Sequence, residues 1–269
     1  MGAYYMLKDS IRKIIEEVSY MSSDEIQSMY KDHVFLRYKN KGVAQTLKGK
    51  VDVIVFFVND KEGKWTPFSI EQAMKRYDSA MRILNAHAVC RGVDLNLSCV
   101  FKELTLSMVC SRNNSSEWQK AIAGLYNKKK MSDYQNYYKK KYACDEAVVM
   151  FSFCKDFRCF ASHSEKKSTY NDEYSAIDYD AKEDDIIHEL LHQFGAVDFY
   201  YPFQVKNLLL LLNYKSVMCE NSFLYIDSLT SYIIGWTDCI TEKAAKVLEN
   251  TKHFTPEMIL EAKRKEWEE

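Results

Sequence analysis

The spacing of hydrophobic residues near the N-terminus predicts helices. Apolar side chains recur at helical intervals from Ile11 to Val18, so they share one helix face. The run from Ser22 to Glu25 has the form of a capping box and predicts the start of a second helix. We therefore expect residues 1–47 to form an N-terminal helical segment, followed by one larger domain over residues 48–269.

The hydrophobic period changes after residue 47. Residues 48–60, KGKVDVIVFFVND, are a compact run of β-branched and aromatic residues, which is typical of a buried strand. A second capping box at Ser69–Gln72 predicts a long helix that extends to about Val89. The run from Val93 to Met108 again has the composition of a strand.

Strands and helices continue to alternate in the second half of the chain. A capping-box pattern at Ser116–Gln119 predicts a helix through Tyr126, and Glu146–Phe160 predicts a strand or hairpin. A helix carrying two histidines follows from about Asp184, and two further helices close the chain, the last one starting at Thr255. This order predicts an α+β fold in which a mixed, twisted sheet is packed against helices.

Composition and charge exclude some classes of partner. Hydrophobic residues make up 47% of the 269 residues, which is enough for one large core or two small lobes. The 37 basic and 38 acidic residues give a net charge of -1, so we expect neither a nucleic-acid partner nor an anionic membrane. Lysines and aromatics are mixed from Lys128 to Tyr142, which we interpret as a solvated face rather than a nucleic-acid surface.

Localisation is only weakly indicated. Apolar runs do not reach the roughly 18 residues of a transmembrane helix, and the N-terminus has charges where a signal peptide would be apolar. The eight cysteines include no C-x-x-C pair, and several lie within apolar runs. We expect a cytoplasmic protein with reduced thiols, the alternative being a secreted protein with disulfides whose signal peptide was removed.

The candidate chemistry lies in HELLHQFGAVD, residues 188–198. A helix places His188 and His192 one turn apart on the same face, where two imidazoles can bind one zinc ion. Glu189 is then positioned to act as the general base that takes a proton from water and passes it to the leaving amine. The competing interpretation is a pair of packed histidines that is satisfied by hydrogen bonds alone.

A third ligand is expected directly after this helix. Gly195 can adopt the left-handed conformation that ends a helix and turns the chain back. Asp198 follows three residues later and offers a carboxylate oxygen. Asp198 has two other possible roles, capping a turn or orienting a ligating histidine, and Glu220 is the rival ligand if the site is thermolysin-like.

Together these residues resemble the extended motif of the metzincin zinc metallopeptidases. The third ligand of that family is usually histidine, but the snapalysin-like members have aspartate. Ser216–Cys219 resembles the family's Met-turn, in which Met218 would be a structural floor and not a ligand. Asp227–Trp236 resembles the helix that follows this turn, so the resemblance covers about residues 183–236.

The resemblance implies a zincin-like, two-lobed fold and a single catalytic zinc ion between the lobes. The upper lobe would comprise residues 48–195, and a small, mostly helical lower lobe would comprise residues 196–269. Peptides would lie extended beside an exposed strand upstream of the active helix, for which the Val148–Phe160 region is the candidate. Tyr200 or Tyr201 would be candidates for stabilising the transition state, although packing roles are expected more often, and the tyrosine that astacins have after the Met-turn is absent here.

The predicted function is that of a zinc-dependent endopeptidase, a protease acting on peptide or protein substrates. The alternative is an inactive zinc-binding relative whose cleft serves as a recognition module. An intact Glu189 favours the enzyme, because a binding protein needs no proton shuttle. A third hypothesis is a latent enzyme in which the N-terminal helices cover the zinc.

Overall fold

The continuous apolar run at the start of the main domain forms the central strand of a five-stranded sheet. The computed structural model describes residues 19–125, 131–162, 173–201, 203–219, 224–259 and 261–262. The sheet has the order β3-β2-β4-β6-β5. Its strands are β2 (Gly49–Asn59), β3 (Leu95–Thr105), β4 (Glu146–Phe153), β5 (Phe160–Ser162) and β6 (Tyr174–Ile177).

The strands are parallel except at one edge. β2 pairs in parallel with both β3 and β4, and β6 continues the parallel arrangement beside β4. β5 runs antiparallel to β6 and forms the edge strand. The sheet is thus mixed, and the prediction of an α+β fold with a mixed sheet is confirmed.

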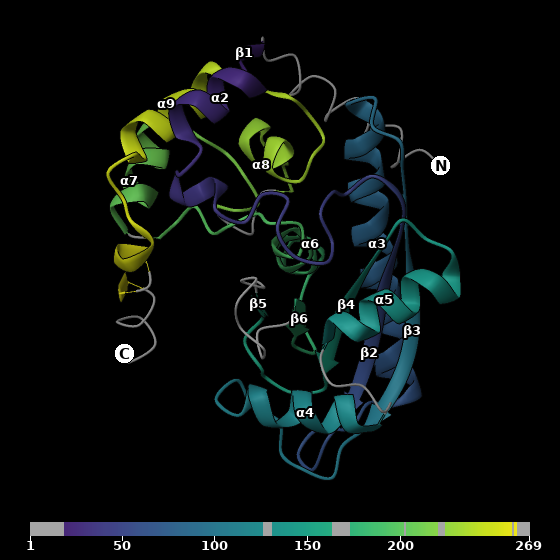
Figure 1. Cartoon of the computed structure of the whole chain (residues 1–269). Helices are drawn as coiled ribbons and strands as arrows, with labels where there is room; N and C mark the ends of the chain where they lie inside the picture. The colour runs from purple at the N-terminus through teal and green to yellow at the C-terminus, as the bar shows by residue number, and fades with distance from the viewer. Residues whose placement is uncertain are drawn as a thin grey trace.

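Helices cover both faces of the sheet, which explains why β2 is apolar throughout (Figure 1). Val53 and Phe57 of β2 belong to the core that contains α3 (Pro67–Cys90) and α6 (Glu183–His192). Phe56, from the opposite face, packs in a second core with α4 (Ser115–Leu125) and α5 (Met131–Tyr142). The histidine-bearing helix therefore lies on the α3 face of the sheet.

A smaller group of elements packs on the other side of α6 (Figure 1). It contains α7 (Phe203–Leu211), α8 (Ser228–Ile233), β7 (Cys239–Thr241) and α9 (Glu242–Thr251). In Figure 1, α6 is seen nearly end-on between the sheet and this C-terminal group. Among the described residues, no helix combines the length and the apolarity that crossing a bilayer requires.

The described part of the N-terminal segment packs on the C-terminal group. It consists of β1 (Ser19–Ser22), α2 (Ser23–Tyr30) and a 3-10 turn at Val34–Leu36, and β1 pairs antiparallel with β7. The Tyr30 hydroxyl donates to Glu249 at 2.9 Å, and the Trp236 indole donates to the Leu47 carbonyl at 2.6 Å. The capping box at Ser22 is confirmed, β1 was not predicted, and the helix expected from Ile11 to Val18 lies outside the described residues.

Two predicted helix starts are shifted. α3 begins at Pro67 because Thr66 is its N-cap, and the Ser69 side chain completes that capping box instead of starting its own. α4 begins at Ser115 instead of after Ser116, and its predicted end at Tyr126 lies outside the described residues.

Two further predictions need correction. Residues 146–160 do not form a hairpin, because β6 lies between β4 and β5. The lysine-rich segment is helical from Met131, and only one face of this helix is solvated, because Tyr134 and Tyr138 are buried against the sheet. Lys128 lies outside the described residues.

Candidate metal centre and cleft

α6 is held on the sheet by its apolar side chains and by one buried amide. Leu190 and Leu191 are fully buried in the core shared with α3. Directly after the helix, the Gln193 side chain accepts a hydrogen bond from the Val149 N–H at 3.2 Å and donates one to the Val149 carbonyl at 3.1 Å. This amide satisfies backbone groups of β4 and fixes the C-terminal end of α6, where the second histidine lies.

Three acceptor atoms form a small buried triangle beside α6. His188 Nε2 lies 3.1 Å from His192 Nε2 and 3.1 Å from Asp198 Oδ1. The third side, from His192 Nε2 to Asp198 Oδ1, is also 3.1 Å. All three side chains are buried, so the folded chain brings together the ligand set that was expected from the sequence.

Backbone carbonyls determine which nitrogen of each histidine faces this triangle. His188 Nδ1 lies 2.9 Å from the Val217 carbonyl, and His192 Nδ1 lies 2.8 Å from the Ala196 carbonyl. A carbonyl only accepts hydrogen bonds, so each Nδ1 carries a proton and each Nε2 faces the triangle. A proton or a metal ion held among these three atoms would satisfy them.

The charges around His188 raise its pKa. Burial alone would lower the pKa of His188, but the hydrogen bond to Asp198 and the charges of Glu189 and Asp198 raise it to about 9. A proton and a metal ion would therefore compete for the same three acceptors.

The donor set fits zinc. Tetrahedral zinc with bonds of about 2.0–2.1 Å to nitrogen and oxygen places neighbouring ligand atoms about 3.3 Å apart, close to the observed separations. Two neutral imidazoles and one carboxylate are also a common protein ligand set for a catalytic zinc, which keeps a fourth position open. The rival ligand Glu220 lies outside the described residues.

Gly195 turns the chain so that Asp198 can reach the histidines. Its φ is +90°, and a Cβ there would lie only 2.5 Å from the Tyr38 carbonyl oxygen. The N–H of Ala196 donates to the Leu191 carbonyl at 3.2 Å, which closes the end of the helix. Glycine is therefore required both by the left-handed conformation and by the close approach of the N-terminal segment.

The turn at Ser216–Cys219 contacts both His188 and the segment that carries Asp198. The Cys219 N–H donates to the Ser216 carbonyl at 3.0 Å, and the Met218 carbonyl accepts from the Phe199 N–H at 2.9 Å. The second bond ties down the segment that carries Asp198, while the neighbouring Val217 carbonyl orients His188. The Met218 side chain is fully buried.

Glu189 lies where two hollows meet. A cleft of about 610 Å³ is lined by Glu189, His192 and Asp198, and an adjoining hollow of about 570 Å³ is lined by Glu189 and His188. Glu189 is itself buried, and its carbonyl accepts a hydrogen bond from the Ser175 hydroxyl at 2.7 Å. The carboxylate expected to act as a base thus borders the same space as the candidate ligands.

Both tyrosines that follow Asp198 reach the cleft. Tyr200 lines both hollows, and its ring stacks beside His188 with the ring centres 6.2 Å apart. Tyr201 lines the larger cleft only, with its ring centre 4.6 Å from that of Tyr200. Of the two, Tyr200 is nearer to the candidate centre.

The edge strand beside the cleft is β5, which corrects part of the predicted peptide-binding region. Residues 148–153 belong to β4, which is enclosed between β2 and β6 and offers no free edge there. Phe160, Ala161 and Ser162 of β5 line the cleft. Only the C-terminal end of the predicted region therefore contributes to an exposed edge.

Sequence patterns missed several residues that line the cleft. Arg112 lies on the loop between β3 and α4, and Arg158 and Cys159 lie on the loop between β4 and β5. These loops have no periodic pattern and no ligand spacing, and only the folded parallel sheet brings the ends of β3 and β4 to the same edge.

Comparisons with known proteins identify no family. No family model matches the chain, and no curated protein matches it. One solved structure, named "Structure of a chaperone-substrate complex", superposes with a TM-score of 0.41 at 15% sequence identity. The match covers 80% of this chain but only 39% of that chain, and at this TM-score it indicates neither fold nor function.

Proposed function

We propose that this chain is a zinc-dependent peptidase in which His188, His192 and Asp198 hold the metal and Glu189 is the general base. The observation that carries the proposal is the buried triangle of three acceptor atoms with sides of 3.1 Å. Backbone carbonyls hold both Nδ1 atoms, so the two Nε2 atoms and the Asp198 oxygen are the atoms that converge.

The surrounding residues support a catalytic site more than a purely structural one. When bound, zinc lowers the pKa of a coordinated water and polarises the carbonyl of the bond to be cleaved. Glu189 borders the cleft next to His188 and would accept the proton of the attacking water and donate it to the leaving amine. Tyr200, beside His188, is the better of the two tyrosine candidates for stabilising the oxyanion.

The arrangement of the elements also supports the metzincin-like interpretation. α6, which carries two of the proposed ligands, lies between the sheet and the C-terminal group, as expected for a two-lobed zincin (Figure 1). The edge strand β5 precedes α6 in the chain and lines the cleft. A peptide or protein substrate extended along β5 would gain main-chain hydrogen bonds by strand addition.

Metal content tests the ligand set. The protein, purified without added zinc and analysed by inductively coupled plasma mass spectrometry, is expected to contain one zinc ion per chain. His192→Ala should lose the zinc and Asp198→Ala should retain much less, because each removes one of three ligands. His253→Ala changes an exposed histidine and serves as the matched control. Full zinc retention in the Asp198 variant would remove that residue from the ligand set.

Cleavage of an unfolded protein tests the activity. Reduced and alkylated lysozyme is expected to be cut by the wild type and about a thousandfold more slowly by Glu189→Gln, which keeps the side chain's size but removes the base. Both proteins should contain equal zinc. Equal cleavage rates would refute the role of Glu189, and zinc binding without any cleavage by the wild type would favour the recognition module.

A further inference from the structure

The larger cleft is asymmetric in charge. Glu189 and Asp198 belong to the proposed centre, and apart from these two the charged side chains among the described lining residues are Arg112 and Arg158. The adjoining hollow differs, because several aspartates line it together with Arg158 and Lys182: Asp156, Asp178, Asp180 and Asp185. A negatively charged group would therefore be favoured on one side of Glu189 and disfavoured on the other.

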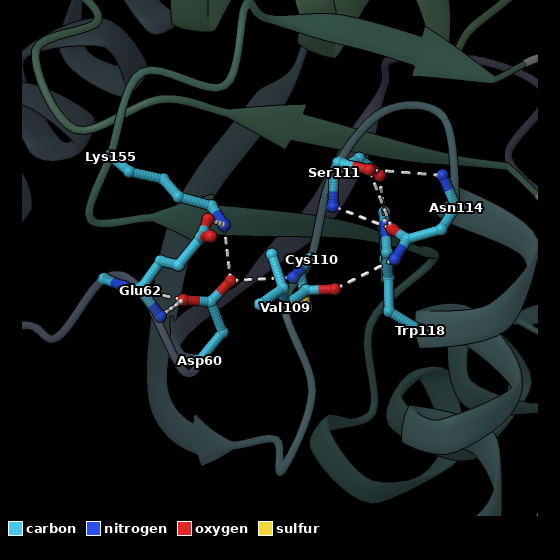
Figure 2. A network of polar contacts seen from close by, with 9 residues as sticks. Asp60, Glu62, Val109, Cys110, Ser111, Asn114, Trp118 and Lys155 are labelled. Atoms are coloured by element: carbon cyan, nitrogen blue, oxygen red, sulfur yellow. Dashed lines mark hydrogen bonds and ion pairs between the residues drawn. The ribbon is translucent and has the colours of Figure 1, made fainter.

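One buried carboxylate holds the two loops that carry these arginines (Figure 2). Asp60 Oδ2 accepts from the Cys110 N–H at 2.8 Å and from Lys155 Nζ at 2.5 Å. Cys110 lies two residues before Arg112, and Lys155 lies three residues before Arg158. These contacts lower the pKa of Asp60 despite its burial, so its charge is retained. Asp60 thus links the two loops that carry Arg112 and Arg158.

The loop with Arg112 is further fixed by its own hydrogen bonds (Figure 2). Asn114 accepts from the Ser111 N–H at 2.7 Å and donates to the Val109 carbonyl at 2.9 Å. The Trp118 indole donates to the Ser111 carbonyl at 3.0 Å. A loop held at so many points loses little conformational entropy when its arginine binds a ligand.

Both arginines lie close to the edge strand. The guanidinium of Arg112 lies 5.2 Å from the ring centre of Phe160, the first residue of β5. Arg158 precedes Phe160 by two residues and has a left-handed backbone with a φ of +48°. Both therefore flank the strand along which a substrate would extend.

We propose that Arg112 and Arg158 form an anion subsite that selects peptides with an aspartate or glutamate on one side of the cleaved bond. This proposal rests on the peptidase function and specifies its substrate class. Guanidinium groups bind carboxylates through two parallel, charge-assisted hydrogen bonds. Replacing the glutamate of a substrate by glutamine should therefore lower kcat/KM about tenfold or more.

The test uses two pools of synthetic octapeptides that differ only in a fixed central residue, glutamate or glutamine. The wild type should cut the glutamate pool at least about tenfold faster, with the glutamate on one side of the cut bond only, as identified by mass spectrometry. In the double variant Arg112→Gln/Arg158→Gln the ratio of the two rates should fall towards one. Arg82→Gln, on the exposed face of α3, should leave the ratio unchanged, and Arg112→Lys/Arg158→Lys should retain part of it.

A binding measurement separates failure of the subsite from failure of the peptidase function. Fluorescein-labelled versions of the two pools are titrated with the Glu189→Gln variant, and binding is followed by anisotropy. Tighter binding of the glutamate pool that depends on the two arginines, and that weakens in 0.5 M NaCl, supports the subsite even if the wild type cuts nothing. Equal binding of the two pools, or no binding of either, overturns it. If the double variant fails to fold by circular dichroism, the single variants Arg112→Gln and Arg158→Gln replace it.

Discussion

The candidate centre and the wall of the cleft beside it are built in opposite ways. The ligands of the centre lie within eleven residues of one another, are buried, and are oriented by carbonyls of the adjacent turns. The arginines of the cleft lie on two separate loops, and a distant carboxylate, Asp60, links them. Proximity in the chain thus brings the candidate ligands together, whereas long-range contacts place the loops that line the cleft.

Among the variants that test this comparison, Gly195→Ala should cause the largest loss of unfolding free energy. The left-handed φ of +90° and the Tyr38 carbonyl at 2.5 Å from the new Cβ should together cost about 4 kcal/mol of unfolding free energy. Urea denaturation measures this loss, and zinc content should fall with it. Gly124→Ala is the matched control, because Gly124 lies in α4 with open space around its Cβ, and it should be neutral or stabilise by up to about 1 kcal/mol. Similar unfolding free energies for the two variants would contradict the assigned role of Gly195.

Asp60→Asn should disturb the cleft wall and leave the centre intact. It removes the buried partner of Lys155, which is only 17% exposed, and leaves only the exposed Glu62 beside the ammonium, so it should destabilise the fold by about 3 kcal/mol. Zinc content should remain at the wild-type level, while the preference for glutamate over glutamine peptides declines. Glu71→Gln, which breaks an exposed ion pair with Lys75, should change neither quantity. Loss of zinc in the Asp60 variant would show that the two regions are coupled.

Mild acid should weaken the contact between α3 and the segment that leads into α8, through His87. Burial first, and then the charge of Arg91, lower the pKa of His87 to about 4, while its Nε2 lies 2.7 Å from the Leu224 carbonyl. The unfolded chain therefore binds more protons between about pH 6.5 and pH 4, so this stability is present above pH 6.5 and is lost as the pH falls. The loss between pH 7 and pH 5 should be about 2 kcal/mol.

The comparison of wild type with His87→Gln isolates this contribution. His33, whose pKa burial also lowers to about 4, acts with the same sign, whereas Asp178, whose pKa burial and Asp180 raise to about 6, acts with the opposite sign. Both groups remain in the variant, so the difference in urea midpoints between pH 7 and pH 5 reports His87 alone. An equal pH dependence in the two proteins would refute the prediction.

The smallest effect is expected from Met218→Leu. The side chain is fully buried, and leucine nearly conserves its volume, so the unfolding free energy should fall by less than about 1.5 kcal/mol. Zinc content should not change, because the turn contributes its carbonyl groups and not the sulfur. A marked loss of zinc would instead give Met218 a direct role at the centre.

Elements with strong local sequence signals were predictable. The buried strand that became β2 and the capped helix that became α8 were confirmed, because each has strong local signals. The strand β6 was missed because it has only four residues. Its position between β4 and β5 depends on strand pairing, which its own residues do not indicate. α5 was missed as a helix because its lysines and tyrosines suggested a solvated surface.

By itself the sequence determined the candidate centre of this protein. The spacing of His188 and His192 on a helix, and the turn at Gly195, place the candidate ligands and Glu189 together through local geometry alone. Only the tertiary structure decided that the Val217 carbonyl orients the His188 imidazole, that β5 is the edge strand, and that two arginines share one cleft wall. These features depend on contacts between residues far apart in the chain, and loops joining parallel strands carry no periodic signal of where they will meet.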